Sequence, residues 1–284
     1  MSNFEEYDIK ETKKSGSILK FSALAIAVLL LAQLPASIVI LMMPKGITSG
    51  MIFCVSQLVL TLVILLPISK KTSLLPAKSI FRLTAKPPVR VYLFSILGLV
   101  AVSAIGSSIM SLQYHFLPDN VNLWLDQMYA STAGLYSNLF YTGFNYQLLL
   151  AVLGAAIIVP VYEEMVFRGY LQKNLEVLKR PTLAIILTSL IFTLLHFNLA
   201  EILPLFILAF YVGVITYKTD SLKIAITCHV LNNTFAIVKM NLSSPADNLT
   251  LATDILPIWI AGLILVLGIG TLFVIFKYFL KETH

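Results

Sequence analysis

Residues 19–43 read LKFSALAIAVLLLAQLPASIVILMM, a run that contains a single charged side chain, Lys20. A stretch of this length and composition is long enough to cross the ~30 Å hydrocarbon core of a bilayer as a helix. Seven further apolar runs are long enough, or nearly long enough, to do the same: 51–68, 91–111, 146–162, 181–197, 202–217, 222–238 and 255–276. Backbone groups in lipid must be satisfied within each segment, so these runs are expected to be helical. The sequence therefore predicts an all-α polytopic membrane protein of about eight transmembrane helices, forming a single integral-membrane domain over residues 1–284.

The composition supports this fold class and disfavours soluble ones. Hydrophobic residues make up 58% of the 284 residues and charged residues 12%, and the mean hydropathy is +0.89. A soluble domain usually carries about 25% charged residues, so this chain has too few charges to cover a soluble core. The net charge of +6 is then assigned to loops and to contact with membrane lipid, and no nucleic-acid partner is expected. Cys54 and Cys228 lie in apolar runs and suggest neither a disulfide framework nor a thiolate metal site.

The basic residues predict how the chain is oriented in the membrane. If the N-terminus is cytoplasmic and the spans alternate, 18 of the 20 Lys and Arg residues lie on the cytoplasmic side, and only Lys45 and Lys239 lie outside. This asymmetry follows the positive-inside rule. Both termini are therefore expected in the cytoplasm, with the protein in the cell membrane as a multi-pass integral protein. The outer loop 112–145 has no Lys or Arg and is rich in aromatic residues, which favours an amphipathic interfacial helix over a substrate lid.

Ionisable side chains within the spans are few, and they are candidates for function. An Asp, Lys or Arg near the centre of a membrane helix costs at least about 2.5–3.5 kcal/mol, so such residues are rarely kept without a role. Three short segments contain the polar residues of interest: Glu163, Glu164 and Arg168 in VYEEMVFRG (161–169), Phe192 and His196 in FTLLH (192–196), and His229 and Asn233 in HVLNN (229–233).

Helix arithmetic brings these three segments to a similar depth. Glu163 lies 16 residues before Lys179, and His196 lies 16 residues after Arg180, on either side of a turn expected before Pro181. At ~1.5 Å per residue, both side chains lie about 24 Å from that turn. His229 lies about 12 Å into its own span from the same side. We therefore expect Glu163, His196 and His229 to converge on one intramembrane cavity that opens toward the cytoplasm.

The spacing of the residues suggests what each could do. Glu164 and Arg168 have the acid-first i,i+4 spacing of an ion pair, whereas Glu163 has no such partner and could act as a general base on water. His229 and Asn233 are also i,i+4, and together they could donate hydrogen bonds to an oxyanion. The structural alternative applies to all of these residues, because intramembrane His, Asn and Glu–Arg groups also hold helices together.

The three segments, in this order on three hydrophobic helices, resemble the motifs of the CPBP family. This family comprises the CAAX proteases and bacteriocin-processing enzymes, is also called the Abi family, and has the Ras-converting prenyl-protein endopeptidase among its relatives. The resemblance covers residues 146–239 and implies an intramembrane endopeptidase. Its substrate would be a peptide or protein, either prenylated or unmodified, that is cut near the cytoplasmic leaflet during CAAX-type or bacteriocin processing.

The resemblance also implies roles for individual residues. Glu163 matches the family's water-activating carboxylate, and Glu164 with Arg168 matches the rest of the first motif. His196 and Phe192 match the second motif, where His196 assists catalysis and Phe192 supports the site. The third motif is matched by His229 and Asn233, the residues that would stabilise the oxyanion.

The residues leave open whether a metal takes part. Glu163, His196 and His229 could supply three zinc ligands and leave one position for water. The sequence has no His-Glu-x-x-His helix, and Asn233 suits an oxyanion donor better than a ligand. Hydrolysis without a cofactor is therefore favoured, with zinc as the alternative. Two other functions could use the same residues: a transporter or proton relay, and a non-catalytic bacteriocin immunity or scaffolding membrane protein.

Overall fold

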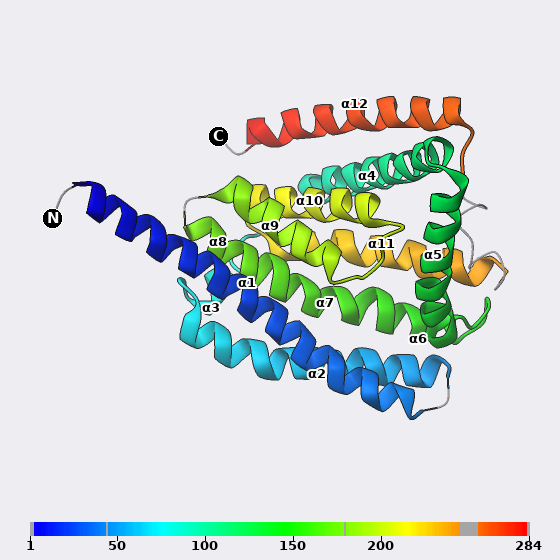
Figure 1. Cartoon of the computed structure of the whole chain (residues 1–284), viewed down its shortest axis with the longest axis horizontal. Coiled ribbons are helices and arrows are strands. Elements are labelled where there is room, and N and C mark those ends of the chain that lie inside the picture. The colour runs from blue at the N-terminus through cyan, green and yellow to red at the C-terminus, as the bar shows by residue number, and fades with distance from the viewer. Residues whose placement is uncertain (1–2, 44, 179, 245–254, 283–284) are drawn as a thin grey trace.

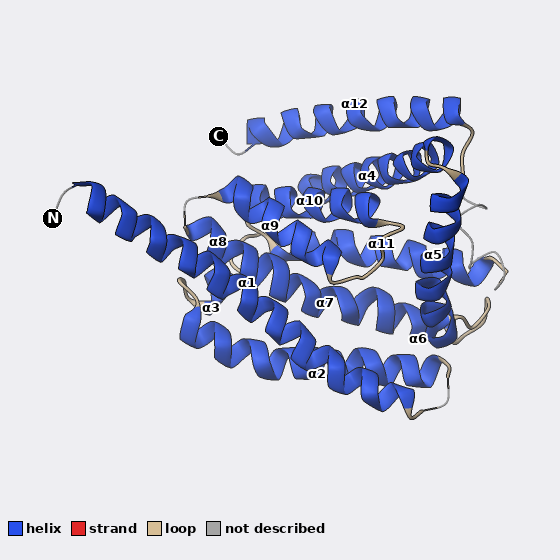
Figure 2. Cartoon of the chain, viewed as in Figure 1, coloured by secondary structure: helices blue, strands red, loops and turns tan. Residues whose placement is uncertain are grey.

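The computed structural model describes residues 3–43, 45–178, 180–244 and 255–282, and these ranges contain helices and loops but no strand (Figure 2). The long helices are α1 (Asn3–Leu41), α2 (Ile47–Thr72), α4 (Val89–Phe116), α10 (Ile202–Thr219), α11 (Leu222–Leu242) and α12 (Ile258–Glu282). A shorter helix, α9, covers Pro181–Leu194. Before α9 runs one continuous helical segment of α6 (Leu148–Ala151), η1 (Val152–Ile158), α7 (Val159–Glu164), η2 (Met165–Gln172) and α8 (Lys173–Val177). Every predicted apolar run falls largely within one of these helical segments, so the all-α prediction is confirmed.

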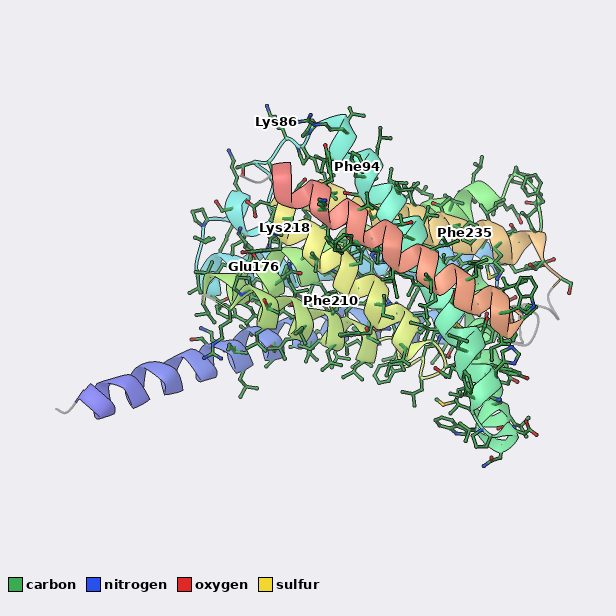
Figure 3. All side chains as sticks on the ribbon, turned by 90° about the horizontal axis from the view of Figure 1, so that it is seen from above. Lys86, Phe94, Glu176, Phe210, Lys218 and Phe235 are labelled. Carbon is green, nitrogen blue, oxygen red and sulfur yellow. The ribbon has the colours of Figure 1, made fainter. Side chains whose placement is uncertain are left out.

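The described helices fit a multi-pass membrane protein. Six of them are long and apolar enough to cross a membrane: 16–35 within α1, α2, α4, the segment 148–177, α10 and 258–278 within α12. Of the other two predicted spans, α9 is shorter than a full crossing, and α11 carries the polar third motif. The start of α1 and the end of α12 lie at the same end of the molecule, as an even number of crossings requires (Figure 1). Lys86, Glu176 and Lys218 lie at this same end, and Phe235 lies toward the other (Figure 3).

The helices are arranged around the segment 148–177. In Figure 1, α1 and α2 lie along one side of it and α4 and α12 along the other, with α9, α10 and α11 between them. Close packing here depends on small residues, because a Cβ at Gly98 of α4 would overlap the Tyr211 phenol of α10. The Tyr211 hydroxyl donates to the carbonyl oxygen of Ser95 at 2.7 Å, which joins α10 to α4.

The outer loop folds as predicted into a helix, α5 (Asp119–Phe140). It runs across the end of the bundle opposite to the termini, at a steep angle to the other helices (Figure 1). At one end, Phe140 packs in a cluster with Cys54 and Ala155, and nearer the other end Leu125 packs against Ala200. Helix α5 therefore bridges the outer ends of several other helices and does not cross from one face of the membrane to the other.

Candidate active site

The first motif lies on a helix with two widened turns. The π-helical stretches η1 and η2 flank the α-helical segment α7, which contains Glu163 and Glu164. Pro160 at the start of α7 has no backbone N–H to donate to residue 156, which favours a widened turn before it. Such turns are rare and often occur at functional sites. A regular helix is expected here from the spacing of the first motif, and Pro160 is the residue in the sequence that indicates the irregularity.

Glu164 and Arg168 form a buried ion pair. Arg168 Nη1 donates to Glu164 Oε1 at 3.0 Å, and the side chains of both residues are only 1% exposed. Arg168 Nη2 donates to the carbonyl oxygen of Ala209 in α10 at 3.0 Å, and its guanidinium lies 4.8 Å from the centre of the Phe192 ring. The i,i+4 pair expected from the sequence is thus present, and it joins η2 to α9 and α10.

Glu164 also orients the histidine of the third motif. His229 Nδ1 lies 2.8 Å from Glu164 Oε1, and an ionised carboxylate can only accept, so Nδ1 carries the hydrogen. The other ring nitrogen, Nε2, then faces Glu163 Oε2 at 3.7 Å. The Glu163 side chain is 15% exposed and that of Glu164 only 1%, so Glu163 is the carboxylate that a substrate or a water molecule can reach.

The second motif joins this group through an aromatic ring. The Phe192 ring lies 4.4 Å from the His196 ring and 5.8 Å from the His229 ring, measured between centroids, and it also contacts Phe167. His196 Nδ1 lies 2.8 Å from the carbonyl oxygen of Phe192, which can only accept, so this nitrogen also carries a hydrogen. Nε2 of His196 is therefore the nitrogen with a lone pair, available to a water molecule or a metal ion.

Asn233 lies one helical turn beyond His229 on α11. Its side-chain nitrogen Nδ2 donates to the carbonyl oxygen of Ala155 in η1 at 3.2 Å, and its oxygen accepts a weaker hydrogen bond from Asn232 at 3.4 Å. An amide nitrogen carries two hydrogens, so one remains for another acceptor. These contacts hold the amide on the side of α11 that packs against η1 and α7.

The structure therefore brings the predicted residues together to different degrees. Glu163, Glu164, Arg168 and His229 form one contact network, and His196 is linked to it through Phe192. Among the described residues, no group of three or more His, Cys, Asp or Glu side chains is arranged to hold a metal ion. If a metal bound, the atoms to hold it would be a Glu163 carboxylate oxygen and the Nε2 atoms of His196 and His229.

Two further polar contacts at this site were missed by sequence reasoning. The Tyr162 hydroxyl donates to Gln57 Oε1 in a buried hydrogen bond, which ties α7 to α2 directly beside Glu163. Gln57 is a polar residue inside an apolar run, so the rule that identified the histidines could have identified it too. The second contact is that of Arg82 with the carbonyl oxygen of Arg168. Arg82 gives no such signal, because it lies in a loop on the predicted cytoplasmic side, where the positive-inside rule leads us to expect basic residues.

Taken together, the fold and the site define a polytopic membrane protein whose helices enclose a cluster of glutamate, histidine, asparagine and arginine. Residues 144–235 match the family model described as Type II CAAX prenyl endopeptidase Rce1-like. The matched segment contains all three motifs and supports the resemblance to the CPBP family of CAAX proteases, whose members are peptidases of the membrane. No curated protein and no solved structure matches the chain significantly.

Proposed function

We propose that this protein is an intramembrane endopeptidase in which Glu163 activates the water that cleaves a peptide bond near the cytoplasmic leaflet. The observation that carries the proposal is the difference between the two adjacent glutamates. Glu164 is buried and bonded to Arg168 and His229, whereas Glu163 is partly exposed and faces Nε2 of His229. This arrangement lies within the segment that matches the family model.

In the first chemical step, Glu163 takes one proton from water as the water oxygen adds to the scissile carbonyl carbon. The π electrons of the carbonyl bond move to its oxygen and give a tetrahedral oxyanion. His196, whose Nδ1–H is held by the Phe192 carbonyl, accepts a hydrogen bond from the water at Nε2 and orients it. The remaining Asn233 amide hydrogen donates to the oxyanion, and His229 donates to it through Nε2 when the ring is protonated at both nitrogens, with Glu164 holding Nδ1–H.

In the second step, the oxyanion collapses and the carbon–nitrogen bond breaks. The bonding pair moves to the amine nitrogen, which takes the proton held by Glu163. The products are a new carboxylic acid and a new amine, and Glu163 returns to its carboxylate form. Glu164 and Arg168 take no part in these proton transfers. They hold His229 in one orientation and balance charge within the bundle.

The substrate class follows from the family match and from the position of the site within the bundle. We propose a peptide or protein segment that reaches the site from the membrane. It would be prenylated as in CAAX proteins, with unmodified bacteriocin precursors as the second class. A bacteriocin immunity or scaffolding role would instead require peptide binding without turnover, and a transporter would move its ligand without cleaving it.

The test is peptide profiling with purified protein in detergent. Farnesylated and unmodified peptides are incubated in water enriched in oxygen-18, and the products are analysed by mass spectrometry. We expect cleavage with one labelled oxygen in the new carboxylate, and no cleavage by the Glu163→Gln variant. The matched control is Asp119→Asn, which makes the same change at an exposed position of α5 and should cleave like the wild type. Peptide binding without products from the wild type would favour the immunity or scaffolding role.

A further inference from the structure

The loop between α3 (Ala77–Ile80) and α4 sends a buried arginine into the bundle. Arg82 is 0% exposed and has a positive φ of 49°, which is uncommon for a residue with a side chain. Its guanidinium donates from Nη1 to Asp220 Oδ1 at 2.6 Å, from Nη2 to Glu176 Oε1 at 2.7 Å, and from Nε to the carbonyl oxygen of Arg168 at 3.2 Å. One side chain thus contacts α8, η2 and the turn between α10 and α11.

The backbone around Arg82 is docked at the same place. Its carbonyl oxygen lies 3.4 Å from the backbone nitrogen of Leu222, the first residue of α11. The neighbouring Phe81 ring packs against Gly169, where a Cβ would come within 2.8 Å of Phe81 Cδ1. The loop therefore sits directly on the residue that follows Arg168 in the first motif.

These contacts link the helix that carries the first motif to the start of α11, the helix that carries the third motif. On one side, Arg82 holds the main chain of Arg168, whose side chain bonds Glu164. On the other side, it holds Asp220, the left-handed residue that ends α10 just before α11. His229 is on α11 and bonds Glu164 on α7. The position of α11 relative to α7 therefore sets the distance between His229 and Glu163.

The local charges explain why an arginine is suited to this place. Lys173 also donates to Asp220 Oδ1 at 2.6 Å, and Gln172 donates to Glu176 Oε1 at 2.8 Å, so both carboxylates are shared acceptors. Buried ion pairs often contribute little net stability, because desolvation offsets the attraction. The planar fork of Arg fixes the directions of several hydrogen bonds at once, whereas a Lys ammonium is a compact charge without that geometry. The contribution expected from Arg82 is therefore to geometry more than to stability.

We propose that Arg82 is a positioning residue for the active site, which sets the register between the helix carrying Glu163 and the helix carrying His229. The turnover part of its test rests on the proposed function, since it requires a peptidase reaction. The second part of the test, which measures local hydrogen–deuterium exchange, does not depend on the proposed function.

The test compares Arg82→Lys and Arg82→Ala with Lys86→Ala, an exposed residue of the same loop. Because a misplacement of ~1 Å can cost about 100-fold in rate, we expect kcat to fall by at least ~10-fold in both Arg82 variants, with KM within about twofold. Guanidinium ion at millimolar concentration should restore part of the kcat of Arg82→Ala, while methylammonium should not. Lys86→Ala should behave as the wild type.

Hydrogen–deuterium exchange of the same proteins is measured independently of activity. We expect residues 159–177 and 216–233 to exchange faster in the Arg82 variants than in the wild type, while α1 and α12 exchange at the wild-type rate. If the wild type cleaves no peptide but this local change is seen, the proposed function fails and the positioning role of Arg82 stands. Unchanged local exchange, an unchanged kcat, an effect on KM alone, or loosening of the whole bundle in Arg82→Lys would each overturn the positioning role.

Discussion

Glu163 and Glu164 are neighbours in sequence with opposite surroundings. Glu164 accepts from Arg168 and from His229 with one carboxylate oxygen, while Glu163 points to the far nitrogen of the same imidazole. A single helical step of ~100° is enough to separate a structural carboxylate from a reactive one. Substitution of Glu164 should therefore lower mainly the stability of the protein, whereas substitution of Glu163 should lower mainly its turnover.

Glu164→Gln is expected to act through stability. The amide leaves the buried Arg168 charge without its partner, and breaking a buried pair in this way typically costs about 3–5 kcal/mol. The melting temperature in detergent should fall clearly, and adding Arg168→Leu should recover part of the loss because the unpaired charge is removed. A Glu164→Gln protein that melts like the wild type would contradict this role of Glu164 in stability.

Asn233→Ala tests the proposed oxyanion contact. Loss of one such donor usually lowers the rate by about 10²–10³, so kcat should fall by this factor with little change in KM. The neighbouring Asn232→Ala is the matched comparison, because it removes the same group from a side chain that donates a hydrogen bond to Asn233. Equal losses in the two variants, or a loss confined to KM, would exclude a specific role of Asn233 in the transition state.

At the scale of elements, the site depends on how α7 is held against α2. The buried hydrogen bond from Tyr162 to Gln57 joins them one residue before Glu163. Both Tyr162→Phe and Gln57→Leu should destabilise the protein by about 1–3 kcal/mol, because each leaves a buried polar partner unsatisfied. The double variant should lose less than the sum of the two single losses when unfolding is followed thermally. Additive losses would show that the two side chains are not coupled.

The sequence predicted the helices well because the signal in each apolar run is strong and local. It also predicted that Glu163 and His229 would meet, since the depth arithmetic needs only helix rise and the position of a turn. It placed the end of the fifth run at Phe197, whereas α9 ends at Leu194 and Phe197 adopts a left-handed conformation. A composition-based boundary cannot detect this, because Leu195 and Phe197 beyond the end of the helix are as apolar as the residues within it.

The remaining parts of the site depend on contacts between distant residues. Arg82 meets its partners across 86, 94 and 138 positions of the chain, and Tyr162 meets Gln57 across 105. Periodicity and spacing describe one helix at a time, so they do not show which loop residue docks onto which helix. Of the two widened turns, η1 has a local signal in Pro160, whereas η2 contains no proline that would indicate it.

At the scale of the whole molecule, the bundle has two distinct ends. One carries the start of α1 and the end of α12 (Figure 1) together with Lys86 and Lys218 (Figure 3), and the other is crossed by α5. The distribution of Lys and Arg predicts that the first end is cytoplasmic. The Arg82 contacts would then hold the cytoplasmic end of the site together, with α5 on the outer side.

Cysteine labelling in intact cells tests this orientation. Lys86→Cys and Asp119→Cys place an exposed thiol at each end, and the native Cys54 and Cys228 are buried, so background labelling should be low. A membrane-impermeant maleimide should label Asp119→Cys in intact cells, and Lys86→Cys only after the cells are opened. The reverse pattern would contradict the predicted topology.

The most direct test of the central claim is the turnover of wild type and Glu163→Gln, each before and after strong chelation, with metal content measured on the same samples. Water activation by Glu163 alone predicts that wild-type turnover survives chelation, and that Glu163→Gln is inactive yet melts like the wild type, because its amide cannot take a proton from water. Comparable turnover by Glu163→Gln would contradict the role of Glu163 as the base. One bound zinc per chain, required for turnover and lost in His196→Ala, would contradict the metal-independent mechanism and make Glu163 a ligand or a metal-assisted base.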